Sequence, residues 1–138
     1  MNKTNVMKLI LLAAGVIGCI VGAGMIFTPV QFHASSGIEL SPNVNLLNEM
    51  RAAGGPLFFS GIVIIAGVFV RRLTVTAWLL AALMYLSYGF GRLVAVMFDG
   101  IPDTFFLWIL GFEIVVGVVC MTFFLKLFTK ESAYLSHS

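Results

Sequence analysis

The sequence predicts an all-α, polytopic membrane protein: a four-transmembrane-helix bundle with both termini cytoplasmic. Of its 138 residues, 60% are hydrophobic and 10% are charged, and the mean hydropathy is +1.06. Soluble domains carry roughly 45–50% apolar and about 25% charged residues. The apolar residues also fall into four long runs, and a helix needs about 20 such residues to cross a hydrocarbon core of about 30 Å. Most basic residues flank these runs on one side.

We predict a single domain over residues 1–138, with spans at about 8–28, 46–70, 73–98 and 104–128. Pro29 stops the first run. None of the runs shows the strict alternation of apolar and polar residues that is typical of bilayer-spanning strands. Helices are therefore favoured over a barrel.

The three connections differ in length and composition. Only Arg71 and Arg72 separate the second and third spans, which predicts a tight antiparallel hairpin. The third and fourth spans are joined by the turn-rich "DGIPD" at residues 99–103. A long loop, "VQFHASSGIELSPN", follows the first span, and Ser41-Pro42 within it predicts an N-cap followed by a proline in the first helical turn.

The distribution of charge predicts the orientation. By the positive-inside rule, the termini and the two-arginine turn face the cytoplasm. The residues on that side are Lys3, Lys8, Arg71, Arg72, Lys126 and Lys130. The opposite side carries Glu39, Glu49, Asp99 and Asp103, with Arg51 and Arg92.

The two cysteines, Cys19 and Cys120, lie in apolar runs and form no C-x-x-C motif, so we interpret both as small packing residues. An alternative concerns the start of the chain. "MNKTNVMKLILLAAGVIGC" resembles a lipoprotein signal ending at Cys19. The apolar run continues through Phe27, however, where a cleaved lipoprotein would turn polar, so a retained first span is favoured.

Two charged residues fall inside predicted spans. Arg92 precedes Asp99 by seven residues, which places it about 10 Å below the outer end of the third helix. Glu113 follows Asp103 by ten residues, about 15 Å down the fourth helix. An unpaired charge at mid-membrane costs at least about 2.5–3.5 kcal/mol, so we expect a pair or a polar pocket. Tyr85 and Tyr88 share a helix face with Arg92, and buried tyrosine hydroxyls need partners.

The stretch "NEMRAAGGP", residues 48–56, places further charges at the outer end of the second span. Glu49 and Arg51 point in nearly opposite directions on a helix. The glycines that follow and Pro56, which cannot donate a backbone hydrogen bond, predict a kink or local unwinding.

Two interpretations of these charges remain open. One is a structural ion-pair network that joins Arg92 to Glu113, and Arg51 to Glu49 or Asp99. The other is an outward-opening pocket for an anionic or amphipathic, lipid-like ligand, since intramembrane charges are candidate functional residues. The candidate ligand-binding residues are Glu49, Arg51, Tyr85, Tyr88, Arg92, Asp99 and Glu113.

Other functions find less support. We see no catalytic motif and expect no cofactor. His33, Glu39, Asp99 and Asp103 lack metal-ligand spacing, and a net charge of +2 is too small to indicate a nucleic-acid partner. The small residues Gly15, Gly18 and Gly22 predict close helix packing, either within the bundle or against a second copy or another membrane protein. In the latter case the chain would be an accessory or scaffolding subunit.

The order of "NEMRAAGG", "GFGR" and "DGIP", followed by an acid in the last span, resembles a bacterial domain-of-unknown-function family of small four-helix membrane proteins. This family is distantly similar to DoxX-like proteins. The positions that match are Pro29, Phe32, Gly37, Asn48, Glu49, Arg51, Gly54, Gly55, Gly91, Arg92, Asp99, Gly100 and Glu113. Pro56 departs from the family pattern. The resemblance supports the fold, and the DoxX link implies a third function, a quinone-linked redox accessory role with Tyr85, Tyr88 and Glu113 near the quinone head group.

Overall fold

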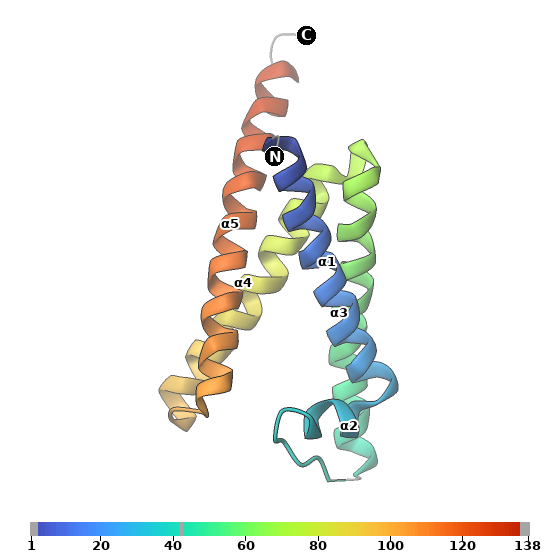
Figure 1. Cartoon of the computed structure of the whole chain (residues 1–138), viewed down its shortest axis with the longest axis vertical. Helices are drawn as coiled ribbons and strands as arrows, with labels where there is room; N and C mark the ends of the chain where they lie inside the picture. The colour runs from blue at the N-terminus through green and yellow to red at the C-terminus, as the bar shows by residue number, and fades with distance from the viewer. Residues whose placement is uncertain (1–2, 42, 136–138) are drawn as a thin grey trace. The chain divides into compact units, whose positions relative to one another are not determined.

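A computed structural model describes residues 3–41 and 43–135, and these residues form helices and short connections without strands (Figure 1). The elements are α1 (Lys3–Phe27), α2 (Pro29–Ala34), α3 (Val44–Phe69), the short 3-10 helix η1 (Arg71–Leu73), α4 (Thr74–Asp99) and α5 (Thr104–Leu135). The chain divides into two compact units, Met1–Ile65 and Ala66–Ser138, and each is described by itself.

Four of the helical segments in the described residues are long and apolar enough to cross a membrane. They are Thr4–Phe27, Val44–Phe69, Arg71–Asp99 and Thr104–Lys130. Each agrees with a predicted span to within a few residues, which is the ordinary uncertainty of helix ends. The all-helical, multi-pass membrane class is therefore confirmed, whereas the orientation of the termini and the single-domain organisation stay predictions.

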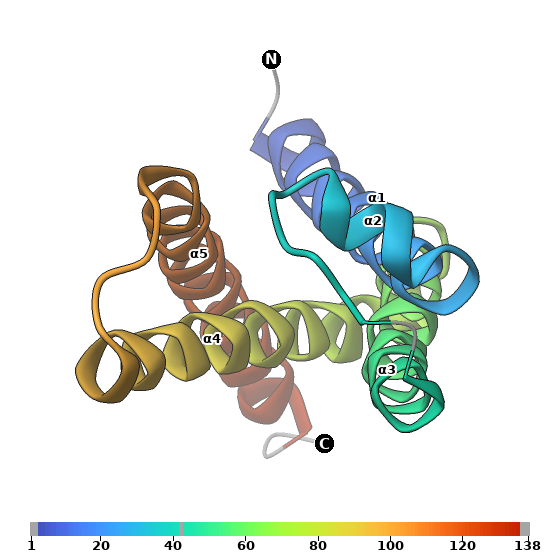
Figure 2. The same ribbon diagram turned by 90° about the horizontal axis from the view of Figure 1, so that it is seen from below.

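In the first unit, α1 and α3 run side by side in opposite directions and approach closely through glycines (Figure 1, Figure 2). A Cβ added at Gly61 would lie 2.7 Å from the backbone nitrogen of Cys19 and 2.7 Å from the carbonyl oxygen of Gly15. Further along, Gly22 and Gly54 face each other, and a Cβ on either would lie 2.9 Å from the other's carbonyl oxygen. Only a residue without a side chain allows the two backbones to meet at these levels.

The predicted loop after α1 is partly helical, which corrects the sequence prediction. Pro29 begins α2 and is buried, in a position where its missing N–H costs no helical hydrogen bond. The Phe32 ring packs directly on Gly24, and Nδ1 of His33 lies 2.8 Å from the Pro29 carbonyl oxygen. The stretch is too short and too polar for hydropathy to mark it as a helix; the contact of Phe32 with α1 holds it in place.

The start of α3 also differs from the prediction, because Asn43 rather than Ser41 caps it. The Asn43 side-chain oxygen accepts hydrogen bonds from the backbone N–H groups of Asn45 at 2.9 Å and Leu46 at 3.3 Å. Asparagine is among the most favourable N-cap residues because it satisfies these otherwise unpaired donors. Pro42, the other half of the predicted signal, lies outside the described residues.

The predicted unwinding at Pro56 is wrong, since α3 is helical from Val44 to Phe69 with Pro56 inside it. Pro56 removes one helical hydrogen bond, the one to the carbonyl of Ala52. The contacts of Gly54 and Gly61 with α1 bracket the proline in sequence. We attribute the continuity of α3 to these contacts, which hold the helix on both sides of the missing bond.

In the second unit, α4 and α5 form an antiparallel pair that cross each other in Figure 2. Trp78 is almost fully buried, and its ring centroid lies 4.8 Å from that of Phe123. Cys120 is buried on α5, as expected for a small packing residue. Gly100, with a φ of 102°, ends α4 and makes the predicted turn into α5, because residues with a side chain rarely adopt this conformation.

The beginning of α4 is fixed to the last turn of α3. The Thr74 hydroxyl donates a hydrogen bond of 2.9 Å to the Gly67 carbonyl, and the Ala77 methyl group lies against Gly67. The connection through Arg71 and Arg72, both exposed, is thus short, whereas the antiparallel arrangement of the second and third spans stays a prediction.

The glycine contact in the first unit predicts a strong contrast between two substitutions on α3. Gly61→Ala places a methyl group against the α1 backbone and should lower the free energy of unfolding by roughly 1–3 kcal/mol, the usual cost of overpacking. At Gly55 an added Cβ meets no described atom within 4 Å, so Gly55→Ala should leave stability unchanged or slightly raised. Unfolding by sodium dodecyl sulfate in mixed micelles measures both. Equal losses would contradict the contact.

Candidate binding site

Arg92 on α4 and Glu113 on α5 form an ion pair in which Nε donates to Oε2 at 2.9 Å. The Glu113 side chain is 10% exposed and that of Arg92 is 33% exposed, so the acid is enclosed while part of the guanidinium reaches the surface of the unit. The predicted pairing of these two residues is confirmed. Each charge compensates the other in a setting where an isolated charge would be costly.

Two glycines allow α4 and α5 to approach at the level of this pair. A Cβ on Gly89, one turn before Arg92, would lie 2.6 Å from Cδ1 of Ile114. A Cβ on Gly117, one turn after Glu113, would lie 2.7 Å from the Leu86 side chain. The sequence pattern gave no sign of this role for Gly89. Ile114 packs against Gly89 and Leu86 packs against Gly117, so the two helices meet through apolar side chains one turn on either side of the pair.

An aromatic ring completes the setting of the guanidinium. The Cζ atom of Arg92 lies 5.8 Å from the ring centroid of Phe106, one of the residues that begin α5. A cation over an aromatic face is attracted by the ring's negative centre, most strongly where water is excluded. Glu113 therefore holds the arginine through Nε, and Phe106 contacts the guanidinium at Cζ. Both contacts leave the outer edge, with Nη1 and Nη2, available for other hydrogen bonds.

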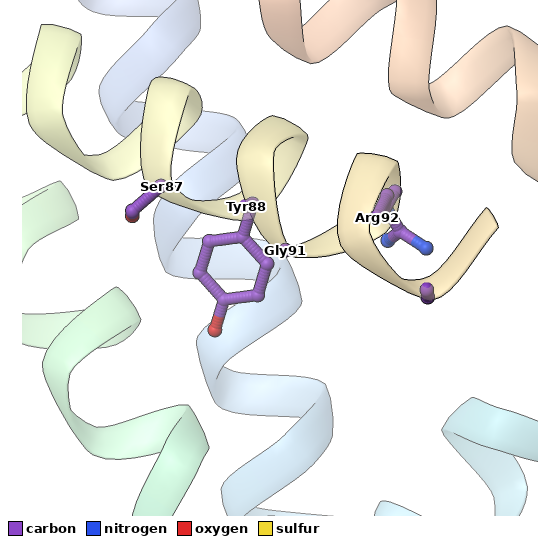
Figure 3. Close-up of a pocket in the computed structure, with 5 residues that line it drawn as sticks. Ser87, Tyr88, Gly91 and Arg92 are labelled. Atoms are coloured by element: carbon purple, nitrogen blue, oxygen red, sulfur yellow. The ribbon is translucent and has the colours of Figure 1, made fainter. Parts of the chain in front are cut away.

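This arginine borders an open hollow along α4. The residues that line the hollow are Ser87, Tyr88, Gly91, Arg92 and Ala95. Figure 3 shows the Tyr88 ring and the Arg92 guanidinium both projecting from α4, one turn apart. The other lining residues, Ser87, Gly91 and Ala95, are small and recur at every fourth position, so they form one row on α4 that is the floor of the hollow. The hollow thus joins one cation and one phenol hydroxyl to a strip with little side-chain bulk.

The other predicted residues of the second unit lie apart from this edge or deeper. Tyr85 is buried, and its ring contacts that of Phe112 edge-to-face with centroids 6.0 Å apart. Asp99 is exposed at the last position of α4. Within this unit the structure therefore brings together Arg92, Glu113 and Tyr88, whereas Tyr85 belongs to the core between the helices.

Glu49 and Arg51 belong to the first unit, and both are exposed on the first turns of α3. Arg51 donates a hydrogen bond from Nη1 to the carbonyl oxygen of Ile26, next to the last residue of α1. The hydrogen bond that the structure gives Arg51 within the first unit is thus to a backbone carbonyl and not to Glu49, whereas its pairing with Asp99 of the second unit stays a prediction. Carbonyls in the last turn of a helix lack helical partners and carry partial negative charge, which suits an arginine. A pocket that includes these two residues stays a prediction.

The remaining candidate residues are the possible metal ligands and the two cysteines. Among the described residues, no group of three or more His, Cys, Asp or Glu side chains is arranged to hold a metal ion. The Cys19 thiol donates to the Phe58 carbonyl at 3.6 Å, within the contact of α1 with α3. Cys19 and Cys120 are both free thiols.

Sequence reasoning missed three residues of the hollow: Ser87, Gly91 and Ala95. Their spacing of four was visible in "SYGFGRLVA" and is the same small-residue signal that drew attention to α1. The contact of Phe106 with Arg92 was also missed, because it depends on how α5 rotates against α4. A pattern along one helix does not contain that rotation.

Comparison with known families identifies one to which the chain is similar over most of its length. Residues 6–124 match the family described as "Domain of unknown function (DUF4345)". The chain belongs to this family. Neither the curated proteins nor the solved structures gave a significant match. The expected membership of a family of unknown function is confirmed, and any assignment of activity therefore depends on the site itself.

Replacing one partner of the ion pair should lower the free energy of unfolding more than replacing both. Arg92→Met leaves the enclosed Glu113 carboxylate uncompensated and should lower the free energy of unfolding by about 3 kcal/mol or more. Adding Glu113→Leu to that variant should restore a large part of the loss, because no charge then remains. A double-mutant cycle of denaturant unfolding in detergent measures the coupling. Additive losses would contradict direct pairing in the folded protein.

Proposed function

We propose that this protein is a non-enzymatic membrane protein that binds an anionic, amphipathic ligand through the outer edge of Arg92. The observation that carries the proposal is the geometry of this residue. Its Nε donates to Glu113, its Cζ lies over the Phe106 ring, and the same residue lines an open hollow. A guanidinium held in this way is already ordered, so an incoming anion does not have to fix the side chain.

The chemistry of the hollow favours a carboxylate or phosphate group. The two terminal nitrogens of a guanidinium form a planar fork that matches two oxygens of either group. Tyr88 adds a hydroxyl one turn away. Because α4 is apolar enough to span a membrane, a ligand that reaches Arg92 from the bilayer must carry its own apolar part.

Titration of the purified protein with amphiphiles tests this proposal. In a nonionic detergent, phosphatidylglycerol or a fatty acid should raise the thermal midpoint of the wild type, whereas phosphatidylcholine should not. Arg92→Gln should abolish the shift. Arg72→Gln, the matched control, removes the same charge from an exposed site 20 residues earlier, about 30 Å along the helix axis, and should retain it.

Two outcomes would overturn the proposal. The first is a wild type that no anionic amphiphile stabilises. The second is an equal loss in Arg92→Gln and Arg72→Gln, which would indicate diffuse attraction by the net positive charge instead of a defined site.

A structural and scaffolding function is the second candidate, and the directness of the Arg92–Glu113 pair favours it. In this case the pair serves only to hold α4 against α5, and the protein acts by binding another membrane protein or a second copy. The proposed contact face remains that of Gly15, Gly18 and Gly22, although Gly15 and Gly22 already contact α3 within the first unit. Pull-down in mild detergent followed by mass measurement separates this function from ligand binding.

We further propose that the protein resides in a bacterial cytoplasmic membrane with both termini inside, which supports an outward-opening site. The positive-inside distribution of lysine and arginine is the basis. In a background of Cys19→Ala and Cys120→Ala, a membrane-impermeant maleimide should label Ser41→Cys on intact cells. Ser132→Cys should react only after permeabilisation, since both serines are exposed in the structure. The reverse pattern would contradict the orientation.

A further inference from the structure

The hollow beside Arg92 has a floor whose shape selects the apolar part of a ligand. Ser87, Gly91 and Ala95 lie in one row along α4, flanked by Tyr88 and Arg92. The row spans eight residues, about 12 Å along the helix axis. Its middle member has no side chain, and a Cβ added at Gly91 would meet no described heavy atom within 4 Å. This glycine is therefore not needed for the packing of α4 against α5, in contrast to Gly89.

Resting on the proposed binding at Arg92, we infer that this row is a trough for a single acyl chain and that the ligand is a long-chain carboxylate, a fatty acid. The carboxylate binds the Nη edge of Arg92, and the first part of the chain lies over Gly91 towards Ser87. Gly91 is then the residue that determines specificity, because any larger side chain there fills the trough.

Two features favour a fatty acid over a phospholipid. The floor is a single row of residues, which suits one chain instead of two. Arg92 lies about 10 Å from the end of α4, deeper than the level at which a phospholipid head group rests. A small carboxylate head that can sink below the interface meets both conditions.

The side chains around the trough agree with this assignment. The Ser87 hydroxyl donates to the Met84 carbonyl of its own helix at 3.0 Å, so its proton is not directed at a ligand. Gly91 and Ala95 offer no side-chain hydrogen bonds. Apart from the Tyr88 hydroxyl, the polar groups that the hollow offers a ligand are those of Arg92, as binding of a molecule with one polar end requires.

Photo-crosslinking tests this inference directly. A palmitic acid analogue with a diazirine near the middle of its chain is added to the full-length protein in phosphatidylcholine nanodiscs. After irradiation, the modified peptides are identified by mass spectrometry. We expect labelling of α4 around Ser87 and Gly91, competed more strongly by unlabelled palmitate than by phosphatidylglycerol.

Two variants isolate the role of the trough. Gly91→Leu should weaken palmitate labelling by roughly tenfold or more, because the added side chain occupies the volume of the acyl chain. Gly111→Leu is the matched control: Gly111 is an exposed glycine of α5, and its Cβ would likewise meet no described atom within 4 Å. Palmitate labelling of this control variant should equal that of the wild type. Thermal unfolding of both variants confirms that they remain folded.

The outcomes separate the trough from the proposed site. If Gly91→Leu retains palmitate labelling while Arg92→Gln loses it, the arginine binds the head group and the trough is wrong. If phosphatidylglycerol competes better than palmitate, the ligand is a phospholipid and the fatty-acid assignment is wrong. If Arg92→Gln also labels as the wild type does, the proposed binding function itself fails.

Discussion

A charged group inside a membrane must find its partner within the protein, and the second unit is organised around this requirement. Glu113 is enclosed, so its ionised form depends on the contact with Arg92. To make that contact, α4 and α5 have to come close where two charged side chains meet. Gly89 and Gly117 provide the approach, and Ile114 and Leu86 pack against them. Packing and charge thus act at the same level of the two helices.

The same requirement explains why the arginine is suited to binding. A lysine could neutralise Glu113, but it would present a single point of charge. Arginine divides its donors between Nε and the terminal nitrogens, so one residue can serve the structural pair and still offer a planar edge to the hollow. The pair and the binding site are therefore not competing interpretations of Arg92. The structural contact uses Nε and orders the side chain, and the ordered edge is what a ligand would meet.

Much of the fold could be predicted because a helix that crosses a bilayer needs a long apolar run, which is visible in the sequence. Length and hydropathy predicted the four spans, and similar depths for Arg92 and Glu113 followed from counting residues to the nearest turn.

The predictions that were wrong or missing concerned local hydrogen bonds and contacts, or the rotation of one helix against another. The Asn43 cap and the helix at Pro29–Ala34 depend on hydrogen bonds and contacts too small to show in hydropathy. The target of Arg51 was missed because backbone carbonyls at a helix end carry no sequence signature. The unwinding predicted at Pro56 was wrong because the prediction considered only the missing hydrogen bond of the proline and not the contacts of its neighbours with α1.

The glycines that join α1 to α3 also restrict how these helices can slide. Gly15 meets Gly61 and Gly22 meets Gly54, so on each helix the two contact points are seven residues apart. Moving one helix by a single turn in either direction would set Leu11 or Cys19 against the backbone at Gly61. Steric overlap at this point therefore opposes the neighbouring registers, in addition to the loss of favourable contacts. A protein with few polar contacts between its helices can in this way specify their alignment through residues that have no side chain.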